Sequence, residues 1–220
     1  MTTKIDGEAG ASRPAVEPEP GAESAKRQQI LDGARRVFLS AGFAAASMGE
    51  IAREAKVSKG TLYVYFDSKE ALFAALIEES KRETAERALV LDPDDPDVAT
   101  ALTAFAIGLI EKLAAPEHVA VVRMVIGIAD RFPALARTFY EAGPNHGRRC
   151  LSAYFAAQRE RGRLVLDDPD TAAWQFMGMC CHPVTVHVLL AGHPAPAPAR
   201  VRSYAEAAVA TFLAGYGPKG

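Results

Sequence analysis

Residues 47–66 read SMGEIAREAKVSKGTLYVYF, and this stretch decides the fold. Ser47 followed three residues later by Glu50 is a capping box, which predicts a short helix over about 48–55. The next two residues predict a tight turn, because a new helix cap follows them directly. Two short helices joined by a tight turn form a helix-turn-helix, whose second helix normally enters the major groove of DNA.

The second of these helices is predicted over 58–66 and contains few strong helix formers. Its N-terminus offers free backbone N–H groups to a phosphate, with Ser58 as cap and Lys59 beside it. Gly60 removes a side chain where DNA must come close. Thr61 carries a hydroxyl and a methyl group, both of which can contact base edges. We therefore interpret these residues as suited to contact DNA and not to stabilise the helix.

Further hydroxyl and ammonium groups extend this predicted interface. Tyr63 and Tyr65 are rigid hydroxyl donors suited to phosphates or base edges, whereas Leu62 and Phe66 anchor the helix to the core. The predicted DNA-contacting residues are Ser47, Ser58, Lys59, Gly60, Thr61, Tyr63, Tyr65 and Lys69. The alternative is a plain helical hairpin with half-buried tyrosines.

Helical patterns flank this unit on both sides. Apolar residues at helical spacing predict a first helix that starts near Ser24 and ends at Gly42. After the helix-turn-helix, Asp67 and Glu70 repeat the cap pattern and predict a longer fourth helix.

Charge is distributed unevenly around this unit. The chain of 220 residues has a formal net charge of −2, yet residues 24–70 contain eight Lys and Arg against five Asp and Glu. Residues 1–23 contain two basic and five acidic residues, lack periodic apolar positions and predict a disordered acidic tail. The local excess of positive charge favours a polyanionic partner for the helix-turn-helix.

Beyond the turn at 92–97, only helical patterns follow, so the sequence predicts an all-α fold. The predicted domains are a helix-turn-helix domain over 24–70, a larger helical domain over 71–216 and a tail over 217–220. No alternation typical of strands is present.

Three cysteines, two of them adjacent, form neither a disulfide framework nor a zinc-binding spacing, and predict a reducing, cytoplasmic location. The N-terminus has no apolar signal region.

Residues 171–199 lack Asp, Glu, Lys and Arg, but their histidines and prolines favour a buried helix over a membrane span. In CCHPVTVH, residues 180–187, successive side chains fan around the helix axis, so we expect no metal and no cofactor. Pro183 predicts a bend there.

The segment RQQILDGARRVFLSAGFAAASMGEIAREAKVSKGTLYVYFDSKEALFAAL, residues 27–76, resembles the DNA-binding domain of TetR-type transcriptional regulators. The resemblance implies a homodimer with an N-terminal DNA-reading head and a C-terminal ligand-binding and dimerisation domain. It also implies that Ser47, Lys59, Tyr63, Tyr65 and Lys69 contact the DNA backbone. Ser58, Gly60 and Thr61 match positions near base edges.

One position departs from the family pattern. The family turn usually reads Ala-Gly-Val, whereas here it reads Ala55-Lys56-Val57. Lys56 must therefore adopt a backbone conformation that glycine takes freely, at some strain, or the turn is altered. Farther along, residues 131–164 are similar to the AefR-like branch of the family.

The resemblance also implies that the last two long helices form a four-helix bundle with those of a second copy, here about 170–191 and 199–214. Their lack of charge and their alanines suit close packing across a two-fold axis. The alternative is that they only form the core of the monomer.

An effector pocket between the middle helices is the last implication of the family. The candidate lining residues are apolar and favour a lipophilic effector. They are Phe105, Leu109, Met124, Ile128, Phe139, Trp174, Met177 and Cys181. The alternative for each of them is a place in the ordinary core.

Together these features predict a repressor that a small lipophilic ligand releases from a palindromic DNA operator. A nucleoid-binding structural protein on the same fold, with no effector, is the alternative. An all-α enzyme is disfavoured, because no nucleophile–base pair, paired inward carboxylates or metal set is present.

Overall fold

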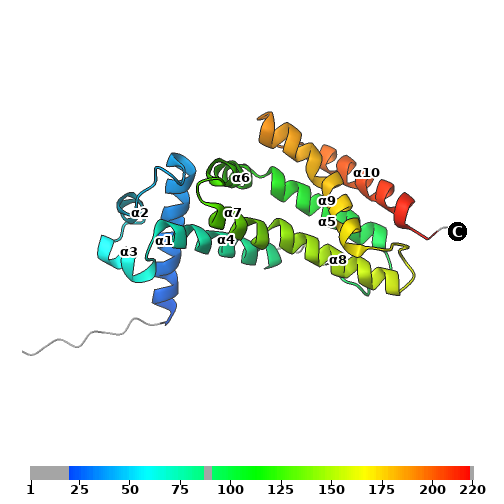
Figure 1. Ribbon diagram of the computed structural model, residues 1–220, viewed down its shortest axis with the longest axis horizontal. Helices are drawn as coiled ribbons and strands as arrows, with labels where there is room; N and C mark the ends of the chain where they lie inside the picture. Colours follow the sequence, from blue (N-terminus) through cyan, green and yellow to red (C-terminus); the bar gives the residue numbers. More distant parts are fainter. Residues whose placement is uncertain (1–19, 87–90, 219–220) are drawn as a thin grey trace, which may run out of the picture.

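The computed structural model describes residues 20–86 and 91–218, with side chains over 23–79 and 91–218, and every regular element in these ranges is helical (Figure 1). The all-α prediction is therefore confirmed. The elements are α1 (Pro20–Ala41), α2 (Met48–Glu54), α3 (Lys59–Tyr65), α4 (Lys69–Glu86), α5 (Val98–Ala114), α6 (Pro116–Ile128), α7 (Pro133–Ala142), α8 (Pro144–Glu160), α9 (Pro169–Val184), the π-helix η1 (Thr185–Leu190) and α10 (Pro198–Tyr216).

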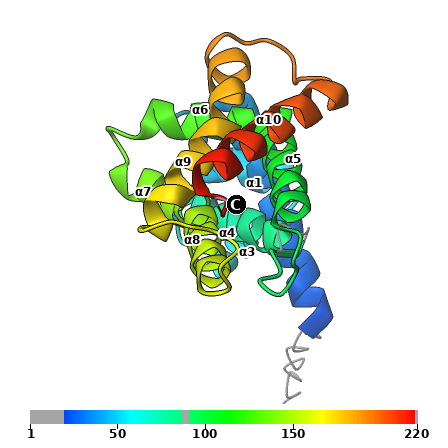
Figure 2. The ribbon, with the colours of Figure 1, turned by 90° about the vertical axis from the view of Figure 1, so that its right-hand side faces the viewer.

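The molecule is elongated, with α1, α2 and α3 forming a head at one end and α5 to α10 forming a body (Figure 1). Figure 2 looks along the long axis from the body end, with α10 beside α5. Helix α4 leaves the head and runs into the body, where it packs against α7. It therefore belongs to both parts of the molecule.

The ends of the helices follow local rules. Gly42 has φ 78°, and its N–H donates to the Phe38 carbonyl (3.0 Å), so α1 ends where the sequence predicts. The prediction of Asp67 as the cap of α4 is wrong: α4 begins at Lys69, and the Ser68 hydroxyl accepts from the Ala71 N–H (3.1 Å). Serine and aspartate cap equally well, so the sequence alone could not choose between neighbours.

The predicted acidic tail over 1–23 lies mostly outside the described residues, which begin with α1 at Pro20.

Among the residues whose side chains the structure describes, two hydrophobic clusters stabilise the fold. The body cluster is centred on stacked and edge-on rings of Phe155, Phe176 and Phe212, with centroids 4.7–6.1 Å apart. The head cluster is centred on Phe38, Phe43 and Phe73, with centroids 5.3–5.8 Å apart.

The head cluster extends beyond the helix-turn-helix. Val125 and Ile128 of α6 and Leu135 of α7 are buried in it, together with α4 residues past position 70. The head therefore shares one packed core with α6 and α7, and a packed interior transmits strain.

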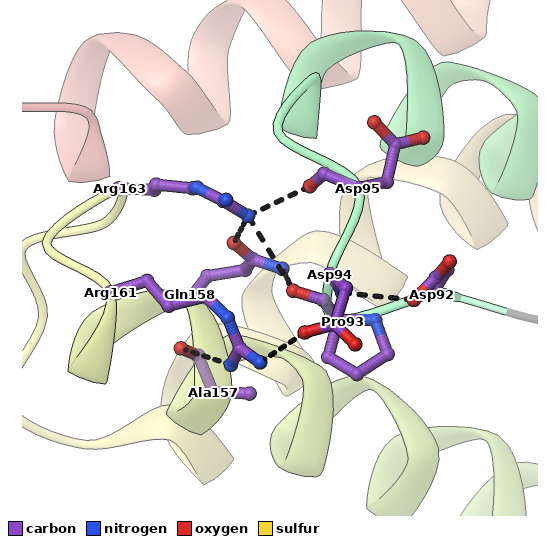
Figure 3. Close-up of polar contacts among 8 residues, drawn as sticks. All are labelled: Asp92, Pro93, Asp94, Asp95, Ala157, Gln158, Arg161 and Arg163. Atoms are coloured by element: carbon purple, nitrogen blue, oxygen red, sulfur yellow. Dashed lines mark hydrogen bonds and ion pairs between the residues drawn. The ribbon is translucent and has the colours of Figure 1, made fainter.

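The loop that precedes α5 is hydrogen-bonded to residues at and just after the C-terminal end of α8 (Figure 3). Buried Gln158 donates to the Pro93 carbonyl (2.9 Å), and Arg163 donates to the Asp95 carbonyl (2.9 Å) and to the Gln158 amide oxygen (3.1 Å). Arg161 pairs with the Asp94 carboxylate (2.5 Å). These contacts satisfy the backbone carbonyls of a loop that has no regular structure of its own.

The segment predicted as one helix over about 170–191 is α9 followed by η1. Pro183 lies inside α9 and cannot donate to the carbonyl four residues earlier, and the chain continues as a π-helix two residues later. Arg123 of α6 donates to the carbonyls of Val188 (3.0 Å) and Leu189 (2.9 and 3.2 Å). It thereby caps the end of η1.

No single helix in the part of the chain that the structure describes is long and apolar enough to cross a membrane; only α5 and α6 taken together, bent by 66°, meet the length and composition criteria.

Candidate nucleic-acid interface

The turn between α2 and α3 is a Schellman motif. The N–H of Val57 donates to the Ala52 carbonyl (2.9 Å), and that of Lys56 donates to the Arg53 carbonyl (3.1 Å). Lys56 has φ 54° and is the one non-glycine residue with positive φ in the described ranges. The expectation that Lys56 takes the left-handed conformation is therefore confirmed, and the turn keeps the geometry that glycine favours.

Glycine is used instead where α1 crosses α2. A Cβ on Gly33 would stand 2.6 Å from the Ala55 Cβ and 2.8 Å from its backbone nitrogen. One turn earlier, the Gln29 amide donates to the Ala55 carbonyl (2.7 Å). Sequence reasoning missed Gly33, although a glycine inside a helical pattern is a signal for close packing.

At the start of α2, the predicted capping box forms. The Glu50 N–H donates to the Ser47 hydroxyl (3.2 Å), and the Ser47 N–H (3.0 Å) and hydroxyl (2.8 Å) donate to the Glu50 carboxylate. These hydrogen bonds from Ser47 lower the pKa of Glu50. In the free protein, the Ser47 hydroxyl proton is therefore engaged by Glu50.

Lys59 lies close to the same helix end. Its Nζ lies 3.4 Å, and the Ser47 Oγ lies 4.0 Å, from the point where a Cβ on Gly49 would stand. Two of the predicted backbone contacts, the cap of α2 and the first residue of α3, are thus brought to the same edge of the head. Lys59 is exposed, so its ammonium is accessible from solvent.

Helix α3 presents one face to the core and the other to solvent. Leu62 is fully buried and Phe66 is 7% exposed, which confirms both as anchors. The Ser58 hydroxyl accepts from the Thr61 N–H (3.0 Å) and is hydrogen-bonded to the Thr61 hydroxyl (2.8 Å). Tyr63 is half exposed, whereas Tyr65 packs against the head cluster.

Lys69 is placed differently from the other predicted contacts. Its ammonium donates to three carbonyls, those of Phe43 (3.0 Å), Ala44 (3.1 Å) and Ala46 (3.1 Å), and lies over the Phe43 ring. All three of its N–H groups are used on the loop between α1 and α2. A phosphate contact by Lys69 would have to replace one of these bonds.

The structure does not bring the eight predicted effector-binding residues together. Four lie in or against the body cluster: Phe105, Leu109, Met177 and Cys181. Three lie in or against the head cluster: Met124, Ile128 and Phe139. Trp174 is 45% exposed, with the Arg148 guanidinium over its ring, and does not line the interior.

Two polar groups among these apolar residues were missed by sequence reasoning. His118 of α6 contacts the Phe139 ring, and burial, with a smaller contribution from Lys112, lowers its pKa to about 4. The buried Tyr154 hydroxyl of α8 has no hydrogen-bond partner among the described residues. A buried hydroxyl without a partner destabilises the fold unless a bound molecule pairs with it.

A groove of about 1020 Å³ runs along α9 and α10. Small residues line much of it, and Gln175, His182 and Tyr216 contribute polar groups. The Tyr216 hydroxyl donates to the Gln175 amide oxygen (2.5 Å). The groove lies between the two helices for which sequence reasoning predicted contact with a second copy.

The adjacent thiols of α9 lie in or against the body cluster. Burial raises the pKa of Cys180 to about 12 and that of Cys181 to about 11, so both are protonated at neutral pH. Among the described residues, no group of three or more His, Cys, Asp or Glu side chains could hold a metal ion.

Comparison with known proteins gives two family matches. Residues 30–76 match the bacterial regulatory proteins of the tetR family, and residues 100–218 match the C-terminal domain of AefR-like transcriptional repressors. The second match alone covers more than half of the chain.

Individual proteins agree with these matches. The HTH-type transcriptional regulator UidR of Escherichia coli is 49% identical over 51 residues, which are 23% of this chain and 26% of UidR. The matches to curated relatives thus span about a quarter of the relatives' length. A TetR-family regulator from Mesorhizobium loti has a similar structure (TM-score 0.81, 30% identity, covering 89% of this chain and 98% of the other). So does the flavonoid-responsive regulator FrrA (TM-score 0.77, 34% identity, 90% and 100%).

Proposed function

Because the chain belongs to the TetR family of transcriptional regulators, we propose that it is a cytoplasmic repressor which binds a palindromic operator as a homodimer and is released by a small apolar effector. The observation that carries this proposal is the continuity of the head cluster with α6 and α7. A molecule bound between the middle helices would displace the same helices on which the head is packed.

We assign the dimer contact to α9, η1 and α10. The groove along α9 and α10 includes Gly178, Ala207 and Gly215, whose lack of bulk lets helices of a second copy approach closely. An isologous contact of this kind would set the two α3 helices on successive major grooves, about 34–36 Å apart.

We place the effector where the two clusters meet, between α5, α6, α7 and α8. The predicted residues around this region are apolar apart from the sulfur atoms of Met124, Met177 and Cys181, which supports an apolar ligand. His118 is neutral at physiological pH and contacts the Phe139 ring, so it can pair with a polar atom of the ligand.

The relative FrrA is flavonoid-responsive, and it is 34% identical over a match that covers all of its chain. Planar aromatic compounds with hydroxyl groups are therefore the first effector class to test. Their rings would suit Phe139, and their hydroxyls would suit His118.

The test begins by selecting bound duplexes from random-sequence DNA with the full chain. Flavonoids, and saturated fatty acids as a comparison, are then added to the complex with the selected duplex. We expect a palindromic site and at least a tenfold loss of affinity with some planar aromatic compounds. Unchanged operator binding across both sets would contradict effector release.

The same selection tests the alternative of a nucleoid-binding structural protein. Such a protein would enrich no single palindrome and would bind many unrelated duplexes with similar affinity. For the dimer, Gly178→Leu at the groove should shift the sedimentation coefficient toward that of the monomer. Gly127→Leu, on the exposed side of α6, is the matched control and should remain dimeric.

A further inference from the structure

The centre of the outward face of α3 is apolar. Successive residues of an α-helix are rotated by about 100°, so Gly60 and Val64 both lie within about 20° of the line opposite buried Leu62. Val64 is 81% exposed, the most exposed large apolar side chain in the described residues. Thr61 and Tyr63 flank this line on either side.

Single exposed apolar residues are common on protein surfaces, so exposure alone means little. Val64 differs because it occupies the middle of the helix face that enters DNA, next to a glycine whose Cβ would meet only the Ser58 hydroxyl at 3.8 Å. A β-branched residue also stabilises an exposed helix less than alanine does. Helix stability therefore does not explain its presence.

The hydrogen-bonding groups of this face lie beside the line, not on it. The Thr61 hydroxyl is hydrogen-bonded to the Ser58 hydroxyl (2.8 Å), which holds it against the start of the helix. Gly60 and Val64 offer no side-chain donor or acceptor. In the major groove, the base feature that an aliphatic side chain can read is the C5 methyl group of a pyrimidine.

We propose that Val64 reads the C5 methyl group of a thymine in each half of the operator. This inference rests on the proposed function, because it requires a specific duplex. Gly60 leaves room for the base pair to approach, and the Val64 methyl groups then pack against the thymine methyl group. Thr61 and Tyr63 supply the polar contacts around it.

The experiment uses the duplex selected from random-sequence DNA, with each thymine replaced in turn by uracil, which lacks the methyl group. One methyl contact corresponds to about a fourfold change in affinity per half-site, and about 15-fold when both halves are changed. We expect this loss at one symmetric pair of positions. Val64→Ala should bind the thymine duplex about 15-fold more weakly and should no longer distinguish thymine from uracil there.

Two controls make the result specific. Tyr63→Phe, on the same face, should weaken binding to both duplexes equally and keep the thymine-to-uracil ratio. Far-UV circular dichroism should show Val64→Ala folded as the wild type, because Val64 makes little contact with the core.

The outcomes separate the two proposals. If a palindrome is enriched, but the ratio of affinities for the thymine and uracil duplexes is the same in the wild type and Val64→Ala, the methyl contact is overturned. The repressor proposal then still stands. Failure to enrich any duplex would overturn both.

Discussion

Lys56→Gly relieves a backbone that this chain holds in an unfavourable conformation. Lys56 has φ 54°, in the left-handed region, and forms the C′ position of the Schellman motif between α2 and α3. Both hydrogen bonds of the motif come from backbone N–H groups, so glycine keeps them. The side chain is exposed, and its removal leaves no cavity.

The size of the effect follows from two opposing contributions. A non-glycine residue in the left-handed region costs about 1–2 kcal/mol relative to glycine. Glycine makes the unfolded chain more flexible, which opposes folding by about 0.4–1 kcal/mol. The net gain is about 0.5–1 kcal/mol, which corresponds to a rise in Tm of about 1–4 °C for a chain of this size.

The assay is urea unfolding followed by far-UV circular dichroism, at one protein concentration because dimerisation stabilises the folded state. Lys56→Ala is the matched control, since it removes the same charge but keeps a Cβ. We expect Lys56→Ala to unfold within about 0.5 kcal/mol of the wild type and Lys56→Gly to be more stable than both. Lys56→Gly no more stable than Lys56→Ala would refute the strain at this turn.

The same variants also test whether Lys56 contacts DNA. Each phosphate contact adds about one unit to the slope of log affinity against log salt concentration. We expect both variants to keep the wild-type slope, because an exposed lysine in a turn is most simply solvated. A slope lower by about one unit in both variants would show a phosphate contact.

Three further predictions concern stability. Gly33→Ala should lower the free energy of unfolding by about 2–3 kcal/mol, because its Cβ would overlap Ala55. The control Gly127→Ala, in open space on α6, should raise the free energy of unfolding by about 0.5–1 kcal/mol. Equal urea midpoints for the two variants would contradict the close crossing of α1 and α2. Lys69→Met should lower the free energy of unfolding by about 2 kcal/mol without DNA, because three carbonyls lose their donor; a phosphate contact would in addition reduce the salt slope by about one unit. The pKa of His118 in the folded protein, about 4, lies below its value in the unfolded chain, so the free energy of unfolding should fall by up to about 3 kcal/mol as the pH drops from about 6.5 to 4. The variant His118→Gln should lack this part of the pH dependence. Identical pH profiles of stability in the wild type and His118→Gln would refute the burial of His118.

Much of the head could be predicted from sequence because its signals are local. The capping box at Ser47 and Glu50, the cap at Ser58 and the end of α1 at Gly42 each depend on residues at most four apart. The strain at Lys56 was predicted because lysine stands where the turn of the family usually has glycine. The cap of α4 was assigned to the wrong neighbour, because Asp67 and Ser68 satisfy the same local rule.

The candidate contacts depend on more distant residues and were less predictable. Lys69 is a lysine at an expected phosphate position, yet its ammonium is used by carbonyls 23 to 26 residues away in the chain. Val64 is not among the DNA contacts predicted from the sequence, because an apolar residue in a helix normally predicts a place in the core. Only its orientation opposite Leu62 shows that it faces solvent.

The sequence by itself determined the helices, the helix-turn-helix and the family, because caps, turns and apolar periodicity act over a few residues. The tertiary structure decided how the parts are joined. It divided the predicted effector residues between two clusters, packed α6 and α7 into the core of the head, and brought Arg123 to the end of η1. The Arg123 hydrogen bond alone joins residues 66 positions apart, and no local pattern specifies such contacts. They arise when apolar faces from distant helices are buried together.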